Sequence, residues 1–201
     1  MSIETLFRLI FALSLAILYA VRLYHHARAG TLKEPISTPI EGRVIGVFRL
    51  FAAALLVLYP LGYLFAPHLV AWSLFDRPVW LGWIGAGLSA LGLLGITWVN
   101  HTLGRHFSTT LVVRASHAIV TGGPYRYARH PMYTAILAIL LGWIFLTGSW
   151  LVAVMTGLYV VLIMGVRTPR EEAMLLAKFG EPYRAYMART RRFWPLPGQH
   201  A

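Results

Sequence analysis

The segment His117–Tyr133, HAIVTGGPYRYARHPMY, lies between long apolar stretches and concentrates polar chemistry in the middle of the chain. Two glycines and Pro124 predict a turn near its centre. Arg129-His130-Pro131 then leads into an apolar run, and proline suits the first turn of a helix, where a missing N–H costs nothing. The backbone N–H groups at such a helix start lack partners and favour an anion. We interpret the segment as a loop that holds a small ligand with a negative end.

The composition around this loop is that of a membrane protein. Hydrophobic residues make up 58% of the 201 residues and charged residues 12%, about half the usual charged share of ~25% in globular proteins. The mean hydropathy is +0.63. The absence of cysteine excludes disulfides, cysteine–zinc sites and thiol nucleophiles. The formal charge of +11, carried mainly by arginine, indicates cytosolic loops facing anionic lipid rather than a nucleic-acid partner.

Hydrophobic length predicts the spans. A transmembrane helix needs ~20 mainly apolar residues. Four segments approach that length and a fifth is shorter; in chain order the five are Ile3–Leu23, Val44–Phe65, Val79–Val99, Pro131–Thr147 and Trp150–Val166. A secretory signal is the rival interpretation of the first, because Ala27-Arg28-Ala29 resembles a cleavage site, but that site lies too far beyond the apolar run. Only Gly148 and Ser149 separate the last two segments, which predicts a tight antiparallel hairpin. In the third, two rows of small residues (Gly82, Ala86, Ala90 and Gly85, Ser89, Gly92) predict close helix packing.

The basic residues predict how these spans are oriented. If the central loop and the C-terminal tail face the cytosol, fifteen of the eighteen Lys and Arg residues lie on the cytosolic side, and Arg77 is the clear exception. This satisfies the positive-inside rule and places the N-terminus outside. We therefore predict an all-α, multi-pass integral membrane protein with about five transmembrane helices, of which residues 1–99 supply the first three. Residues 100–201 form the second predicted unit, with the central loop, the hairpin 131–166 and an amphipathic tail.

The tail after Val166 is charged and amphipathic. A helix is predicted to start near Pro169 and to end at Gly180, with Leu175, Leu176 and Phe179 on one face and Glu171, Glu172 and Lys178 on the remainder. The predicted topology brings this tail and the start of the fourth span to one membrane surface. His130 and Glu171 are thus expected close together on adjacent helices.

Each candidate residue also has a purely structural interpretation. Glu171 and Glu172 suit the first turn of a helix, where acids complement the dipole and pair with nearby arginines. Arg167 is either a headgroup anchor or a bidentate partner for a substrate carboxylate. His130 caps the fourth helix or contacts a ligand. His101 and His106 make a weak metal case without cysteine or a paired acid, so no metal is predicted.

Together the motifs resemble a known family. GGPYRYARHPMY, one hydrophobic hairpin, and then REEAMLLAKFGEPYRAYMARTRRFWP are similar to the isoprenylcysteine carboxyl methyltransferase family, which is related to the phospholipid N-methyltransferases. The resemblance covers about residues 100–195. It implies a membrane methyltransferase that uses S-adenosyl-L-methionine in a pocket on the cytosolic side.

The resemblance also implies roles for individual residues. His117, Ala118, Ile119 and Val120 match an adenine-side loop, and Tyr125 matches a tyrosine that packs on the cofactor. His130, Pro131, Met132 and Tyr133 match the element in which a helix start receives the methionine carboxylate. Glu171 or Glu172, with Glu171 favoured, matches the acid that contacts the cofactor. Arg167 matches the arginine associated with the substrate carboxylate, so Arg167 and Glu171 are the predicted catalytic residues.

The leading prediction is carboxyl O-methylation of an isoprenylated cysteine, or a similar lipophilic carboxylate, that enters from the bilayer. Pro169-Arg170 before the two glutamates depart from the longer acidic run often seen in the family, which leaves the acceptor open. The alternatives are a phospholipid N-methyltransferase, a small-thiol S-methyltransferase, and a non-catalytic membrane protein or transporter. A transporter is disfavoured because the spans have almost no ionisable groups near their middle. Membrane lipids are expected partners, and no oligomeric state is predicted.

Overall fold

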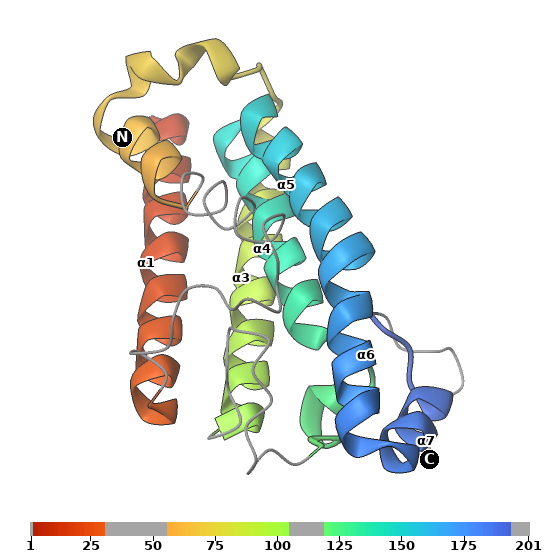
Figure 1. Cartoon of the computed structure of the whole chain (residues 1–201). Helices are drawn as coiled ribbons and strands as arrows, with labels where there is room; N and C mark the ends of the chain where they lie inside the picture. The colour runs from red at the N-terminus through yellow and green to blue at the C-terminus, as the bar shows by residue number, and fades with distance from the viewer. Residues whose placement is uncertain (1, 31–55, 105–118, 194–201) are drawn as a thin grey trace.

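A computed structural model describes residues 2–30, 56–104 and 119–193 of the chain. These ranges contain helices and no β-strand. Within them, two isolated β-bridges pair Leu74 with Ser149 and Ala128 with Arg191. The main helices are α1 (Ile3–Ala29), α3 (Val79–Leu103), α4 (Pro131–Thr147) and α5 (Trp150–Leu162). They form an elongated bundle (Figure 1). The predicted all-α class is confirmed.

Three helices are long and apolar enough to cross a membrane: Ile3–Arg28, Val79–Leu103 and the continuous rod Trp150–Phe179. Pro131–Thr147 and Leu56–Phe65 are shorter apolar helices. The fourth predicted span has the observed bounds of α4, whereas α1 continues six residues past the predicted Leu23. It ends at Gly30, whose φ of +68° suits glycine. Most of the predicted second span, residues 44–55, lies outside the described residues.

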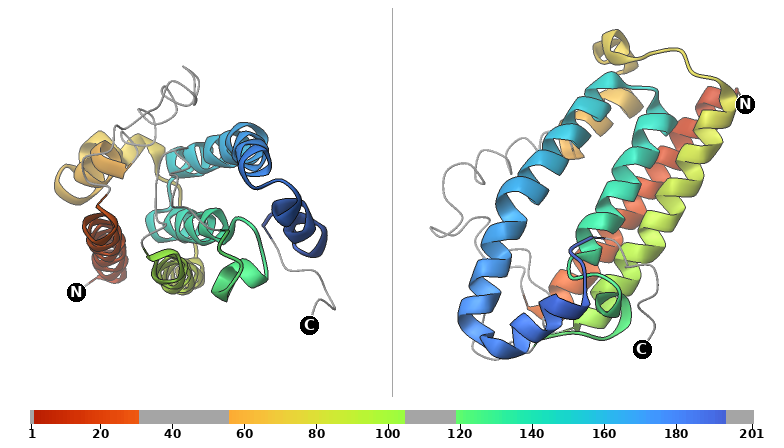
Figure 2. Two further views of the ribbon diagram at one scale, coloured as in Figure 1. Left: turned by 60° about the horizontal axis from the view of Figure 1, so that its bottom comes forward. Right: turned by 90° about the vertical axis from the view of Figure 1, so that its right-hand side faces the viewer.

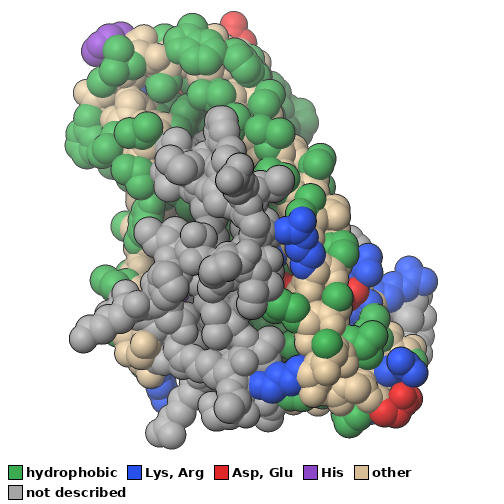
Figure 3. Space-filling view, in the orientation of Figure 1, with side chains coloured by type: hydrophobic (Ala, Val, Ile, Leu, Met, Phe, Trp, Pro, Cys, Tyr) green, Lys and Arg blue, Asp and Glu red, His purple; other side chains and the backbone are tan. Residues whose placement is uncertain are grey.

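The two ends of the bundle differ in character. The C-terminal ends of α1 and α3, the start of α4, and the helices α6 (Thr168–Phe179) and α7 (Glu181–Arg189) lie at one end (Figure 1). The short 3-10 turns η2 (Pro67–Leu69) and η3 (Ala71–Ser73) and the α4–α5 turn lie at the other. On the face drawn in Figure 3, most of the visible charged side chains of the described residues gather over α6 and α7, while the opposite end is mainly hydrophobic. The described parts of the segments predicted to share the cytosolic side therefore lie at one end.

Small residues on α3 allow two different helices to approach it. A Cβ added to Gly92 would come within 2.8 Å of the Ala135 carbonyl oxygen, and one added to Gly85 within 2.7 Å of the Gly142 oxygen, both on α4. Gly82 instead faces the Phe7 ring of α1, at 2.3 Å from the added Cβ. The predicted close packing is confirmed. α3 and α4 run side by side in both views of Figure 2.

Aromatic rings and one buried arginine stabilise the end opposite α7. Phe11 makes edge contacts with Tyr63 and Trp143 at centroid distances of 5.3 and 5.2 Å, a geometry favoured by the ring quadrupoles. The side chain of Arg77 is only 4% exposed and donates to Glu4 at 2.9 Å. It also donates to the carbonyls of Phe145 and Leu146 at the end of α4, which lack partners within the helix. Arg77 is thus a helix cap as well as a loop cation.

α6 begins at Thr168, close to the predicted start near Pro169, but it is continuous with α5. α5 continues through a π-helical turn, η6 (Ile163–Arg167), directly into α6. A proline lacks an N–H donor and crowds the carbonyl four residues earlier, and the wider π-turn accommodates both effects without ending the helix. Gly180, with φ of +59°, ends α6 as predicted, and α7 follows with Pro182 in its first turn.

Candidate functional site

The start of α4 is fixed by the C-terminal segment. The backbone N–H groups of Arg129 and His130 donate to the carbonyls of Arg191 and Arg192, each at 2.8 Å. The hydroxyl of Thr134 donates to the Phe193 carbonyl at 2.9 Å. These bonds join residues about sixty positions apart, so the basic tail lies beside the loop that precedes α4.

Glu172 is the centre of a buried charge cluster. Its side chain is 5% exposed and accepts from Arg129 Nε at 2.9 Å and from Arg192 Nε at 2.8 Å. His130 Nε2 lies 3.3 Å from the same carboxylate. Arg129 also donates to the carbonyls of Met187 and Thr190. A buried charge persists when it is paired and hydrogen-bonded, and here the pairing connects α4, α6, α7 and the tail. The predicted placement of Glu172 on the polar face of its helix is therefore wrong, because its partners are distant cations that cover it.

Glu171 faces a different set of groups. The phenol of Tyr133 donates to Glu171 Oε2 at 2.7 Å and accepts from Arg167 Nε at 2.8 Å. His130 Nδ1 lies 4.0 Å from Glu171 Oε2, and the rings of His130 and Tyr133 stack at 5.6 Å. The Glu171 side chain is 29% exposed. The structure thus brings Tyr133, His130, Arg167 and Glu171 together, as the predicted proximity of His130 and Glu171 requires.

Further polar and charged side chains extend this group of residues toward α1. Tyr159 of α5 interacts electrostatically with both Arg167 and Arg22, and the two arginines interact with each other. Arg22 belongs to α1, which is remote in sequence from the hairpin. Sequence reasoning counted Arg22 only as a cytosolic charge, because nothing in the local pattern of α1 links it to α5.

Three tyrosines form the wall between the loop and the tail. Burial raises the pKa of Tyr125, and the negative charge of Glu171 raises it further, which places this phenol near the Glu171 carboxylate. Burial likewise raises the pKa of Tyr183, and it raises the pKa of Tyr186 to about 12. All three therefore stay protonated at neutral pH and can donate hydrogen bonds. Tyr186 donates to the Tyr125 carbonyl at 2.6 Å.

The remaining predicted residues are placed as follows. Ile119 and Val120 are half-buried and lie outside regular secondary structure, and Pro131 opens α4. Met132 packs against the hydrophobic core. His117 and Ala118 lie outside the described residues. His130 is the N-cap residue of α4 but makes no side-chain capping bond.

Asn100 is a residue of this region that the sequence did not indicate. It is fully buried, and the described residues offer neither its Oδ1 nor its Nδ2 a hydrogen-bond partner. α3 and α4 are antiparallel, with Gly85 beside Gly142 and Gly92 beside Ala135. This register pairs Ile96 with Pro131, so Asn100, four residues further, lies about one turn beyond the start of α4 and level with the loop that precedes it. A buried amide without partners costs ~1–3 kcal/mol, and a bound ligand that supplies them would explain its presence.

The relatives that this chain matches carry two kinds of name. A segment of 124 residues is 32% identical to the cobalt-zinc-cadmium resistance protein CzcN of Cupriavidus metallidurans and covers 61% of this chain and 56% of that protein. A segment of 80 residues is 32% identical to the protein-S-isoprenylcysteine O-methyltransferase of Schizosaccharomyces pombe, covering 40% and 34%. The chain thus spans only about half, or less, of these relatives.

The fold has a solved counterpart. The structure of the eukaryotic intramembrane Ras methyltransferase ICMT superposes with a TM-score of 0.54 at 21% identity, covering 93% of this chain and 66% of that one. Residues 83–177, which hold α3, α4, α5 and both glutamates, match the isoprenylcysteine carboxyl methyltransferase family. The resemblance to the isoprenylcysteine carboxyl methyltransferase (ICMT) family is therefore confirmed over these residues, which make up just under half of the chain.

Proposed function

We propose that this protein is a membrane methyltransferase that uses S-adenosyl-L-methionine to methylate the carboxylate of a lipophilic acceptor, such as an isoprenylated cysteine. The observation that carries the proposal is the convergence of Tyr133, Glu171 and Arg167 beside His130 at the start of α4. This places an acid, a cation and a helix N-terminus at one end of a bundle of apolar helices. Residues 100–201 are the proposed catalytic unit.

The described residues suit the cofactor's charged groups. S-adenosyl-L-methionine carries a carboxylate, an ammonium and a sulfonium, and when bound it supplies a methyl group that a carboxylate attacks directly. We assign the ammonium or a ribose hydroxyl to Glu171, and the carboxylate to the first turn of α4, where backbone N–H groups favour anions. The amide of Asn100, which has no hydrogen-bond partner among the described residues, provides a further donor and acceptor beside the loop that precedes this turn. Tyr125 and the loop 117–120 are the proposed adenine side.

The two glutamates have different proposed roles. Glu172 is surrounded by Arg129, Arg192 and His130, so its charge is neutralised within the protein. Glu171 is more exposed and has a phenol as its hydrogen-bond donor. We assign ligand contact to Glu171 and the shaping of the site to Glu172. These contacts support Glu171 over Glu172 as the acid that contacts the cofactor.

Arg167 is the proposed partner of the acceptor carboxylate, and Tyr133 orients it through the 2.8 Å bond to Nε. Because a carboxylate is already a nucleophile at neutral pH, the chain needs to align the acceptor and exclude water, and no general base is required. A lipophilic acceptor reaches such a site sideways from the bilayer. The described residues contain no group of three or more side chains able to hold a metal ion, and the proposal assigns none.

The test is transfer of a radiolabelled methyl group by the purified protein in lipid. The acceptors are N-acetyl-farnesylcysteine, phosphatidylethanolamine and a small thiol, each against a reaction without acceptor. Base-labile label on the prenylcysteine is expected, since a methyl ester hydrolyses in base. Base-stable label in the lipid amine or on the thiol would contradict carboxyl methylation. Glu171→Gln should abolish transfer, whereas Glu181→Gln, an exposed acid paired with Arg184 on α7, should leave it unchanged.

A binding measurement separates the cofactor site from the acceptor. We expect Asn100→Leu, which keeps the branched shape of the side chain but removes its polar atoms, to weaken binding of S-adenosylhomocysteine about tenfold or more, because the ligand's polar edge loses its partner. The same substitution should raise the melting temperature of the ligand-free protein, because it removes a buried polar group that has no partner among the described residues. Unchanged affinity together with a raised melting temperature would refute the role of Asn100. Absence of binding by the unmodified protein would refute the methyltransferase proposal.

A further inference from the structure

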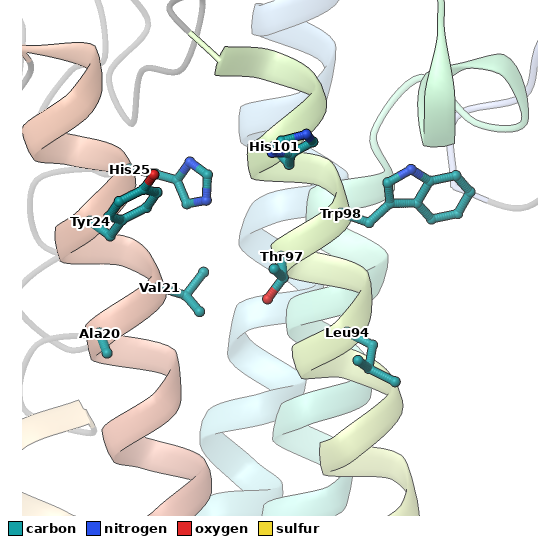
Figure 4. A pocket seen from close by; sticks show the side chains of 8 residues that line it. All are labelled: Ala20, Val21, Tyr24, His25, Leu94, Thr97, Trp98 and His101. Carbon is teal, nitrogen blue, oxygen red and sulfur yellow. The ribbon is translucent and has the colours of Figure 1, made fainter.

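A second candidate site lies between α1 and α3, apart from the polar cluster at α4. An open cleft of about 570 Å³ is lined by Ala20, Val21, Tyr24 and His25 of α1 and by Leu94, Thr97, Trp98 and His101 of α3. Val21 and His25 project from α1 toward α3 (Figure 4). The volume is within the ~300–1,000 Å³ typical of small-molecule sites. Both walls belong to candidate membrane-spanning helices, so the cleft opens to the hydrocarbon of the bilayer.

The cleft changes from apolar to basic along its length. Ala20, Val21 and Leu94 line its deeper part, whereas His25 and His101 lie nearer the helix ends. The hydroxyl of Tyr24 accepts from Arg28 at 3.2 Å, which places a guanidinium next to the lining. His25, 5% exposed, interacts electrostatically with both His101 and Arg28. Among the described residues, the titratable side chains of the lining are thus those of His25, His101 and Tyr24, and Arg28 lies beside them.

This gradient matches the two parts of a phospholipid. An acyl chain needs an apolar groove within the membrane, and its phosphate needs basic donors at the depth of the headgroups. Trp98 and Tyr24, 51% and 58% exposed, are the aromatic types enriched at that depth. The Arg28 guanidinium, with the imidazoles of His25 and His101 as further hydrogen-bonding groups, favours an anionic headgroup over a zwitterionic one.

We propose that the α1–α3 cleft binds an anionic membrane phospholipid, with one acyl chain against Val21, Leu94 and Thr97 and the phosphate at His101 and Arg28. The lipid tethers the end of α1 to α3 where the two helices separate below their close contact at Gly82 and Phe7. This inference does not rest on the proposed methyl transfer. The cleft and the Glu171 site lie on different faces of α3, so an experiment can refute either proposal without affecting the other.

The experiment is photolabelling of the full-length protein in nanodiscs. Phosphatidylglycerol or phosphatidylcholine carries a diazirine at the acyl terminus or near the headgroup, and mass spectrometry maps the labelled peptides. We expect phosphatidylglycerol to label the peptides containing residues 20–25 and 94–101 more than phosphatidylcholine does. Arg28→Gln should reduce the phosphatidylglycerol labelling about fivefold, the effect of one basic side chain on an anionic lipid, and leave phosphatidylcholine labelling unchanged.

A filling substitution provides the second arm. Thr97→Trp places a bulky ring in the cleft and should remove most labelling by both lipids. Leu91→Trp, on the same helix at a 66% exposed position outside the lining, is the matched control and should not change it. Equal labelling by the two lipids, no effect of Arg28→Gln, or label spread evenly along α1 and α3 would refute a specific site. If added N-acetyl-farnesylcysteine displaces the label competitively, the occupant is the acceptor's chain and the phospholipid proposal is wrong.

Discussion

Replacing Glu172 with glutamine tests the buried charge cluster most directly. The substitution keeps the shape of the side chain but removes the negative charge that Arg129, Arg192 and His130 surround. Removing one partner of a buried ion pair costs ~3–5 kcal/mol, because the other charge is left uncompensated. The Arg129 side chain is 9% exposed and pays most of this cost, whereas Arg192, 46% exposed, stays hydrated and contributes little. We expect a loss near 3 kcal/mol, since Arg129 keeps its bonds to the Met187 and Thr190 carbonyls.

The assay is reversible unfolding in mixed micelles by titration with a denaturing detergent, followed by tryptophan fluorescence. Glu181→Gln is the matched control, because it makes the same chemical change at an acid that is 76% exposed and pairs with a 69% exposed arginine. Such a surface pair is worth ~0–1 kcal/mol. A loss of 3 kcal/mol is a large part of the ~5–15 kcal/mol that stabilises a typical domain. If the two variants lose equal free energy of unfolding, the reasoning about Glu172 is refuted.

Three further substitutions test the rest of the fold. Gly92→Ala should destabilise the protein by ~1–3 kcal/mol, because its Cβ would lie 2.8 Å from the Ala135 carbonyl oxygen. Gly87→Ala is the control: nothing in the described residues lies within 4 Å of the added Cβ, so it should stabilise the protein by up to ~1 kcal/mol. The same detergent titration distinguishes the two variants. Arg77→Met should cost ~1–3 kcal/mol, because it leaves the Phe145 and Leu146 carbonyls without their donor. Glu4→Gln changes the 56% exposed partner of Arg77 and should cost less than ~1 kcal/mol. Equal losses in the two variants would show that the ion pair matters more than the cap. Burial raises the pKa of Tyr186 to about 12, so as the pH rises from ~10, where an unfolded tyrosine titrates, to about 12, only the unfolded chain loses the proton and native stability falls. Tyr186→Phe should flatten this part of the decline in melting temperatures measured between pH 9 and 11.5, and an unchanged slope would contradict the assignment.

The sequence predicted the parts of this fold that depend on local pattern. Hydropathy located α3, α4 and α5, Gly148 and Ser149 predicted the hairpin, and the small residues of α3 predicted its close neighbours. Each of these signals lies within one segment, because hydrophobic length and helical spacing are properties of contiguous residues. The termini of α1 and α3 were less accurate, because polar residues such as His25 and Asn100 remain helical when the bundle or the membrane surface accommodates them.

The charge cluster could not be predicted in the same way. Glu172 meets Arg129 and Arg192 across 43 and 20 residues of chain, and the backbone pairing that positions them joins two irregular segments. No periodicity marks such a pairing. The sequence placed cations next to the glutamates at Arg167 and Arg170, and local proximity suggested those as partners. In the folded chain the buried acid Glu172 instead pairs with residues that are distant in sequence. Arg77 likewise contacts the end of α4, which is distant from it in sequence.

The π-turn explains how two adjacent glutamates serve different surroundings. Successive residues of a helix point about 100° apart, and residues four apart share a face. Arg167 at the end of the π-turn is four residues before Glu171, so both meet the Tyr133 phenol. Glu172 is rotated one step further, toward the His130 ring and the arginines. At the start of α4, His130 and Tyr133 are three residues apart and their rings stack. Glu171 and Glu172 therefore contact side chains on the same face of α4. A regular α-helical turn before Pro169 would rotate α6 about its axis and remove this match. The departure from ideal helix geometry is therefore what permits one glutamate to be buried with arginines while its neighbour remains accessible to a ligand.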